Sequence, residues 1–175
     1  GVASENAVRG VPGVQVVSGV RAGEARVFGS HINVTGVEPN VGRVIKIDWK
    51  SGGPGVPAAL GRTGAFISTS YAKDHHLAMG SPVSMELPSG QRVPVKVQGI
   101  FKAPEGGSPF GNVTISAALF DRVYQAPQNV YAFVDMAGGV SEANTAKLTG
   151  ALTAYPDAKV QTESQFKKQQ ESGLN

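Results

Sequence analysis

The sequence predicts an α+β fold in which helices cover one face of a mixed sheet and a β-rich lobe is inserted into the chain. Four observations predict this fold. Twenty-three glycines and eleven prolines imply many turns, and valine outnumbers leucine, which favours strands. Residues 65–101 contain the alternating apolar pattern of a β-hairpin. The last third alternates short strands with helical patterns.

The composition excludes several classes of protein. Hydrophobic residues make up 41% and charged residues 17% of the 175 residues, so the chain is neither disordered nor a membrane span. Cysteine is absent, which excludes disulfides and thiolate metal sites. The net charge is +3 and the basic residues are scattered, so we expect no nucleic acid partner. The chain begins at Gly1 without Met, and we expect it to be a piece cut from a longer protein.

The first third is expected to consist mainly of strands. Residues 3–9 fit the end of a helix that Gly10 and Pro12 stop. We expect strands at 14–20, 24–29, 31–37 and 44–49. The run of glycine and proline at 50–55 then breaks the pattern. It predicts a boundary, with residues 1–49 and 111–175 in one α/β lobe and residues 50–110 in the inserted lobe.

The middle of the chain reads as strand, helix and hairpin. A strand at 65–67 enters a serine and threonine cluster that suits a helix N-cap, and we expect the following turns to end at Gly80. Two alternating strands then flank a turn at Ser89-Gly90. The side chains expected on the buried face of this hairpin are Val83, Met85, Leu87, Val93, Val95 and Val97.

The last third begins with a loop at 103–111, whose proline and glycine content favours the surface. We expect strands at 113–115, 130–134 and 159–161. Helices are expected to begin after Ser116 and Ser141, the first closed by Pro127. Leu148, Ala151, Leu152 and Tyr155 occupy one face of the second. A mostly polar helix is expected to open at 162–165, which has capping-box spacing.

Pro109 and Phe110, in the loop at 103–111, are the candidate partner-contact residues. An exposed aromatic side chain in a loop can bind another protein. The alternative is that the loop folds back and buries Phe110 in the core, which is the more common fate of a lone aromatic residue.

No metal or cofactor site is expected. Asp74, His75 and His76 cluster in sequence, but neighbouring helix residues point about 100° apart, so the two imidazoles cannot face one ion. We expect both to be exposed on the helix. His31 lies on an expected strand and is interpreted as a structural or surface residue. The motif Gly53-Pro54-Gly55-Val56-Pro57-Ala58 matches a dinucleotide fingerprint formally, but Gly61 cuts off its helix and position 75 is not acidic, so we expect a loop.

No catalytic site is expected either. No serine lies in the Gly-x-Ser-x-Gly arrangement of a nucleophile elbow. Asp48, Asp74, Glu86 and Glu105 form no pair at a recognisable spacing. We therefore expect the protein not to be an enzyme.

An ordered series of segments resembles the extracytoplasmic core domain of FtsX-like and MacB-like ABC transporter permeases. The series runs through 36–39, 44–47, 65–68, 97–100, 113–116, 131–134 and 160–162. It covers nearly the whole chain. The resemblance implies a porter-like α/β lobe with an inserted β-rich lobe, placed outside the membrane between two transmembrane helices of the parent chain.

The resemblance also implies a mechanical role. ATP-driven movement of a cytoplasmic ATPase subunit would reach this domain through the terminal segments 3–9 and 162–171. Partners would be the transmembrane helices of the parent chain, that ATPase indirectly, and an extracytoplasmic protein or transported substrate. Permeases of this family work in pairs, so a dimer of the full-length transporter is implied. A freestanding secreted module that binds a ligand or a protein is the alternative.

Overall fold

The computed structural model describes residues 2–125, 129–139, 141–155 and 160–161. The helices are α1 (Val2–Arg9), α2 (Val56–Ala59), α3 (Thr69–Asp74), α4 (Ala117–Val123), α5 (Glu142–Ala151) and the short 3-10 helix η1 (Val41–Arg43). The strands are β1 (Val14–Val27), β2 (Ser30–Val37), β3 (Asp48–Ser51), β4 (Gly64–Ser68), β5 (Pro82–Glu86), β6 (Arg92–Lys102), β7 (Val113–Ser116), β8 (Asn129–Met136) and β9 (Val160–Gln161). Together they confirm the predicted α+β class.

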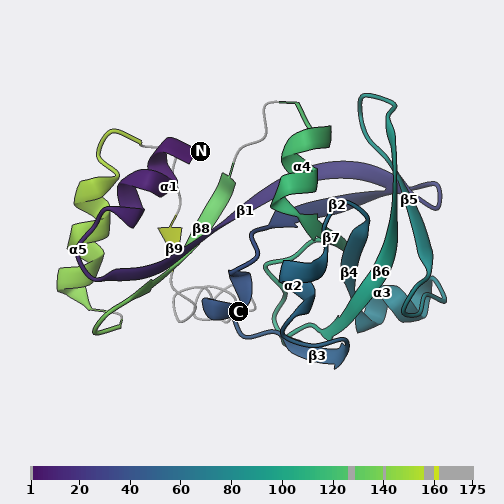
Figure 1. The fold of residues 1–175 in the computed structure, drawn as a ribbon, viewed down its shortest axis with the longest axis horizontal. Coiled ribbons are helices and arrows are strands. Elements are labelled where there is room, and N and C mark those ends of the chain that lie inside the picture. Colours follow the sequence, from purple (N-terminus) through teal and green to yellow (C-terminus); the bar gives the residue numbers. More distant parts are fainter. Residues whose placement is uncertain (1, 126–128, 140, 156–159, 162–175) are drawn as a thin grey trace.

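Six strands pair in a closed ring (Figure 1). The second half of β1 pairs with β2, which runs parallel to β7. The order then continues through β4, β6 and β5, and β5 returns to β1 at the pair Arg26 and Glu86. The seam between β5 and β1 therefore rests on one register pair, whereas the other neighbours share longer ladders.

The predicted hairpin forms a large part of this ring. β5 and β6 pair antiparallel, with Val83 opposite Val95 and Met85 opposite Val93. All six side chains predicted to share its apolar face are buried, together with side chains from β1, β2, β4 and β7. On the polar face, Arg92 and Glu86 form an exposed ion pair at 3.4 Å. The alternation of the sequence thus fixes which face of the hairpin enters the core.

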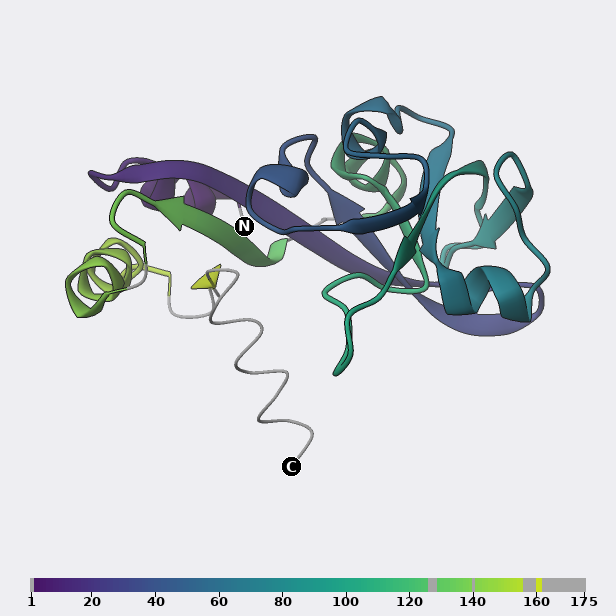
Figure 2. The ribbon, with the colours of Figure 1, turned by 90° about the horizontal axis from the view of Figure 1, so that it is seen from below.

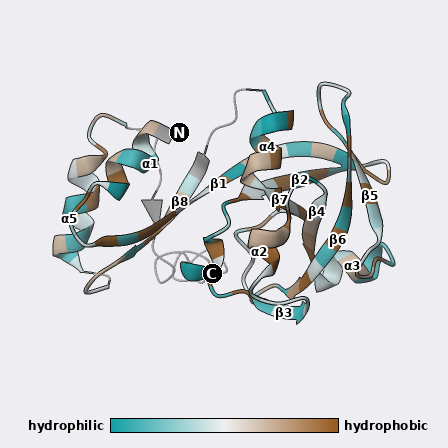
Figure 3. Cartoon of the chain, in the orientation of Figure 1, coloured by the Kyte–Doolittle hydropathy of each residue, from teal (hydrophilic) through white to brown (hydrophobic). Residues whose placement is uncertain are grey.

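The first half of β1 belongs to a second layer (Figure 2). It pairs antiparallel with β8, which runs parallel to β9. Successive valines of β1 point to opposite faces. Val17 packs with Val8 of α1 and Leu148 of α5, whereas Val16 packs with Phe133 of β8 and with Phe66 and Phe101 of the ring strands. Figure 3 shows the hydrophobic stretches of β1 and β8 beside α1 and α5.

One strand therefore joins the two parts of the molecule. β1 runs without interruption for 14 residues, from the layer covered by α1 and α5 into the closed ring. Its register with β8 ends at Arg21 and its register with β2 begins at Val20. β1 therefore belongs to both parts of the molecule.

Several predicted elements differ from the structure. The strand predicted at 44–49 is wrong, because Val44 and Ile45 are buried beside η1 in an irregular segment and the strand spans Asp48–Ser51 instead. The loop predicted at 53–58 contains the start of α2. α3 ends at Asp74, before the predicted end at Gly80, and Tyr155 lies beyond the end of α5.

The remaining sequence predictions concern boundaries and the end of the chain. Strands of residues 50–110 pair with strands on both sides of that segment: β4 with β7, and β5 with β1. The division of the chain into lobes at 50 and 110 stays a prediction. The predicted stop at Pro127 and the helix opening at 162–165 lie outside the described residues. Among the described residues, no helix is long and apolar enough to cross a membrane.

Candidate functional site

The predicted contact residue Phe110 lies in the core. Its side chain is 8% exposed, and its ring meets Phe66 edge to face at 5.3 Å and Phe101 at 5.6 Å. Its backbone N–H donates to Ser108 Oγ at 3.0 Å. The aromatic side chain therefore fixes the end of the loop at 103–111 from within, as the folded-back interpretation expects.

Pro109 is held from the side of β8. The hydroxyl of Tyr131 donates to the Pro109 carbonyl oxygen at 2.6 Å. Burial raises the pKa of Tyr131 to about 12, so this hydroxyl remains a donor throughout the neutral range. Pro109 itself is half-buried, and a partner contact at Pro109 and Phe110 stays a prediction. The exposed part of the loop comes earlier in the chain, at Pro104, Glu105 and Gly107. Figure 2 shows the loop between β6 and β7 projecting from the body of the domain.

A second surface feature lies at the tip of the β1–β2 hairpin, and the sequence reasoning missed it. Phe28 is 53% exposed and Met79 is 47% exposed, and these are the large hydrophobic side chains left exposed among the described residues. The Phe28 ring stacks on His75 at 5.2 Å, and His75 in turn lies 4.4 Å from Tyr71. We call the stacked pair Phe28 and His75 the tip cluster.

The backbone of the tip is unusual for an aromatic residue. Phe28 has φ of 53° and Gly29 has φ of 76°, so both turn residues are in the left-handed region. Two-residue hairpin turns of this kind favour Asn-Gly or Gly-Gly, because a large side chain is strained there. A bulky aromatic residue at this turn was the signal that could have revealed the tip in the sequence.

The three histidines do not gather. His75 caps α3 at its C-terminus and is half-buried against Tyr71, which differs from the exposed helix position expected for it. His76 is exposed, as expected. His31 is exposed on β2, 3.4 Å from Glu24. Within the described part of the chain, no group of three His, Asp or Glu side chains could hold a metal ion.

A charged cluster joins α1, β1 and α4, and consists of Glu5, Arg9, Arg21, Glu38 and Asp121. Arg21 is its centre, with a side chain 10% exposed. Its Nε and Nη2 donate to the two carboxylate oxygens of Asp121 at 3.0 and 3.2 Å. Its Nη1 donates to Glu38 Oε2 at 3.0 Å. Burial alone would lower the pKa of Arg21, but the hydrogen bonds to Asp121 and Glu38 raise it above its ordinary value.

The other half of the charged cluster connects α1 to the segment after β2. Arg9 Nη2 donates to Glu5 Oε1 at 2.8 Å and lies 3.8 Å from Glu38 Oε1. The backbone N–H of Gly19 donates to Glu38 Oε2 at 2.8 Å. Glu38 therefore contacts groups from both α1 and β1. The charged cluster was not predicted from the sequence, because its members come from distant segments: Arg21 and Asp121 are 100 residues apart.

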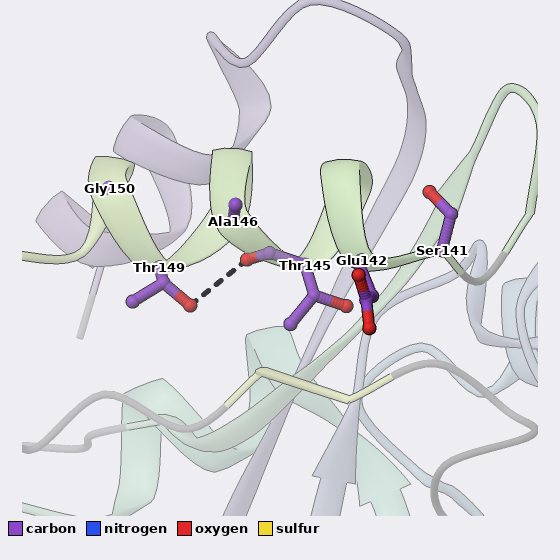
Figure 4. Close-up of a pocket in the computed structure, with 6 residues that line it drawn as sticks. All are labelled: Ser141, Glu142, Thr145, Ala146, Thr149 and Gly150. Atoms are coloured by element: carbon purple, nitrogen blue, oxygen red, sulfur yellow. Dashed lines mark hydrogen bonds between the residues drawn. The ribbon is translucent and has the colours of Figure 1, made fainter.

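A shallow hollow lies along α5 (Figure 4). It is lined by Ser141, Glu142, Thr145, Ala146, Thr149 and Gly150. The Thr149 hydroxyl donates to the Thr145 carbonyl oxygen at 2.9 Å, so its polar group is satisfied within the helix. Ser141 Oγ accepts from the backbone N–H of Asn144 as the N-cap of α5. These contacts stabilise the helix.

Three of the serines have a structural role as helix N-caps. Ser68, Ser116 and Ser141 cap α3, α4 and α5. The Ser116 hydroxyl also donates to the Gly61 carbonyl oxygen at 2.7 Å. These are the helix starts that the sequence predicts at Ser116 and Ser141, and both predictions are confirmed.

Several solved structures share this fold. The periplasmic region of MacB from Actinobacillus actinomycetemcomitans superposes with a TM-score of 0.63 at 14% identity, covering 97% of this chain and 82% of that one. The extracellular domain of the noncanonic ABC-type transporter YknZ from Gram-positive bacteria superposes with a TM-score of 0.59 at 20% identity. The match covers 89% of this chain and 81% of that one. A domain of a putative permease protein from Porphyromonas gingivalis superposes with a TM-score of 0.57 at 16% identity. The match covers 86% of this chain and 73% of that one.

Among curated proteins no sequence matches this chain. The family model of the MacB-like periplasmic core domain matches residues 2–152, which include all the described elements except β9 and confirm the resemblance noted in the sequence. The chain therefore belongs to the MacB-like periplasmic core domain family, the extracytoplasmic domain of ABC transporter permeases.

Proposed function

We propose that this domain couples ATP-driven movement of its parent permease to events outside the membrane, by moving as a rigid body and presenting its tip cluster to a partner protein. The observation that carries the proposal is the continuity of β1, which runs from the layer of α1 and α5 to the hairpin tip at Phe28. A movement applied to α1 is transmitted along one hydrogen-bonded strand.

The charged cluster supports the rigid-body part of the proposal. Arg21, near the middle of β1, binds Asp121 of α4 on one side and Glu38 on the other. Glu38 also contacts Arg9 of α1. Bidentate guanidinium–carboxylate pairs fix orientation as well as distance. The ion pairs thus connect the helical layer to the ring at the point where β1 passes between them.

The tip cluster supports the partner-binding part. Exposed aromatic side chains are enriched where proteins bind one another. Phe28 keeps an exposed ring in a backbone conformation that disfavours large side chains, and residues held in such strained conformations often have a functional reason. Glu105 in the projecting loop is the alternative contact residue. Pro109 and Phe110, at the anchored end of the same loop, would then position it.

Site-specific photo-crosslinking in cells that express the parent transporter tests this contact. A photoreactive phenylalanine derivative at position 28 is expected to give an adduct of discrete mass. The same group at His31, which is exposed on the neighbouring strand, is the matched control. An adduct at Glu105 and none at 28 would move the contact to the projecting loop, and equal labelling at all three positions would refute a specific contact.

A further inference from the structure

We propose that the face of His75 on which the Phe28 ring stacks is a binding slot for an aromatic side chain of a partner protein, and that Phe28 occupies this slot until the partner arrives. The inference rests on the proposed function, since it names the chemistry by which the tip cluster recognises its partner. It gives the two residues separate roles. His75 is the floor of the slot, and Phe28 is an occupant that the chain itself supplies and a partner displaces.

The floor of the slot is attached to the core of the domain. His75 is half-buried at the C-terminal end of α3, and its backbone N–H donates to the Tyr71 carbonyl oxygen at 3.2 Å. The imidazole lies 4.4 Å from the Tyr71 ring. Tyr71 is only 7% exposed and packs in the core of the closed ring of strands. Because a buried ring and a backbone hydrogen bond both hold His75, it keeps its position when the Phe28 ring leaves.

Phe28 is held loosely by comparison. It comes from a different segment, the turn between β1 and β2, and is 53% exposed. Its ring stacks on His75 at 5.2 Å with 25° between the two planes, and no other aromatic ring of the described residues stacks on it. An aromatic pair of this kind changes an equilibrium constant by only about two- to tenfold. Rotation of the Phe28 side chain away from His75 therefore needs little energy.

The backbone conformation of the tip favours a binding role. Phe28 and His76 are the two residues other than glycine that have a positive φ in the described part of the chain, both at 53°. One carries the occupant of the slot and the other directly follows its floor. This conformation is disfavoured by about tenfold for a residue other than glycine, and such outliers cluster where proteins bind ligands. Glycine would suit position 28 of this turn better, so the turn alone does not explain a ring there.

The present occupant shows which group the slot takes. A phenyl ring stacks on His75 in a nearly parallel orientation, so this face of the imidazole accepts a flat aromatic group. A Phe, Tyr or Trp ring of a partner protein would make the same contact from a backbone that is free of the left-handed turn. Aromatic side chains are common anchors of protein interfaces. The incoming ring displaces Phe28, because the two rings compete for one face of His75.

Proton NMR of the Phe28→Gly variant with added toluene tests the slot in the absence of a partner. Glycine adopts the positive φ at position 28 without strain, and toluene is the missing side chain as a free molecule. The ring-proton signals of His75 are expected to return toward their wild-type positions as toluene saturates the slot. The signals of the exposed His76 should stay unchanged, and methylcyclohexane, which has no aromatic face, should shift neither residue. No saturable shift of His75, or equal shifts of His75 and His76, would overturn the proposal.

Photo-crosslinking in the parent transporter separates the slot from the proposed function. With the photoreactive group at position 28, His75→Ala is expected to lower the yield of the adduct by about fivefold, because the partner's ring loses the surface on which it stacks. His76→Asn is the matched control and should keep the yield, since asparagine tolerates the positive φ there. An unchanged yield in His75→Ala would leave the partner contact in place and overturn the slot. Toluene binding without any adduct at position 28 would support the slot and contradict the proposed function.

Discussion

The rings of Phe110 and Phe66 meet edge to face at 5.3 Å, which joins the loop before β7 to the centre of strand β4. Phe101 and Trp49 extend the same aromatic group, with Trp49 5.2 Å from Phe66. Edge-to-face pairs contribute energy beyond the area that they bury. The loop that projects from the domain is therefore attached to an aromatic cluster of the core.

Replacement of Phe110 by alanine should reduce the free energy of unfolding by about 3–5 kcal/mol, because it empties the space between Phe66 and Phe101. Urea unfolding measures this loss. Phe28→Ala is the matched control, since it removes the same ring from an exposed position and should change stability by less than about 1.5 kcal/mol. Equal small losses from both variants would mean that Phe110 is a surface residue after all.

Replacement of Gly36 by alanine should destabilise the domain by about 1–3 kcal/mol. A Cβ atom at this position of β2 would lie 2.7 Å from Cβ of Phe120 in α4, and neither atom can move without shifting its backbone. Gly42→Ala provides the control, because no atom lies within 4 Å of the added carbon there. Thermal unfolding measures the melting temperatures of the two variants. Equal melting temperatures would contradict the close contact between α4 and β2.

Replacement of Arg21 by alanine should reduce the free energy of unfolding by about 3–5 kcal/mol, because Glu38 loses a charged partner in a partly buried place. Asp121→Asn should cost only about 1 kcal/mol, since Asp121 is 40% exposed and its amide oxygen still accepts a hydrogen bond. The order of the two losses, measured by urea unfolding at pH 7, is the test. A larger loss from Asp121→Asn would contradict the central place of Arg21.

Replacement of Phe28 by asparagine should raise the free energy of unfolding by about 0.5 kcal/mol. Asparagine tolerates the left-handed turn at φ of 53°, and this gain should exceed the loss of an exposed ring stack on His75. Ser30→Asn, at the start of β2, is the control outside the strained position. A loss of more than about 1 kcal/mol would show that the stacked ring, and not the backbone strain, dominates the energy of the tip.

The sequence was most informative where one local pattern decided the structure. The alternation of valines in 83–97 correctly predicted the buried face of the hairpin, and Ser116 and Ser141 marked the starts of two helices. Val44, Ile45 and Ile47 have the same β propensity, yet they lie in an irregular segment after η1 and pack against side chains of β1, β8 and the outer face of the ring. These side chains are buried although their backbone is not paired in a sheet, and β propensity alone does not predict such an irregular segment.

The candidate sites depend on contacts between distant segments. Closure of the ring requires β2 to pair in parallel with β7, about 80 residues later. Glu5, Arg21, Glu38 and Asp121 come together only once that ring and the helices are in place. Each is unremarkable in its own segment. Phe28 was the exception, because an aromatic residue before Gly29 between two strands was visible in the sequence and was overlooked.

The most direct test of the coupling proposal is fluorescence energy transfer in the full-length parent transporter, between a donor at the domain tip and acceptors on lipid headgroups. The chain lacks cysteine, so His31→Cys places the donor on β2 without competing thiols in this domain. In a separate variant that also carries Ala3→Cys, at an exposed position of α1, a donor and an acceptor on residues 3 and 31 report the distance between the two ends of the domain. Trapping the transporter with ATP is expected to change the transfer from residue 31 while the distance between residues 3 and 31 stays constant. Unchanged transfer from residue 31, or a changed distance between residues 3 and 31, would contradict the movement of this domain as a rigid coupling element.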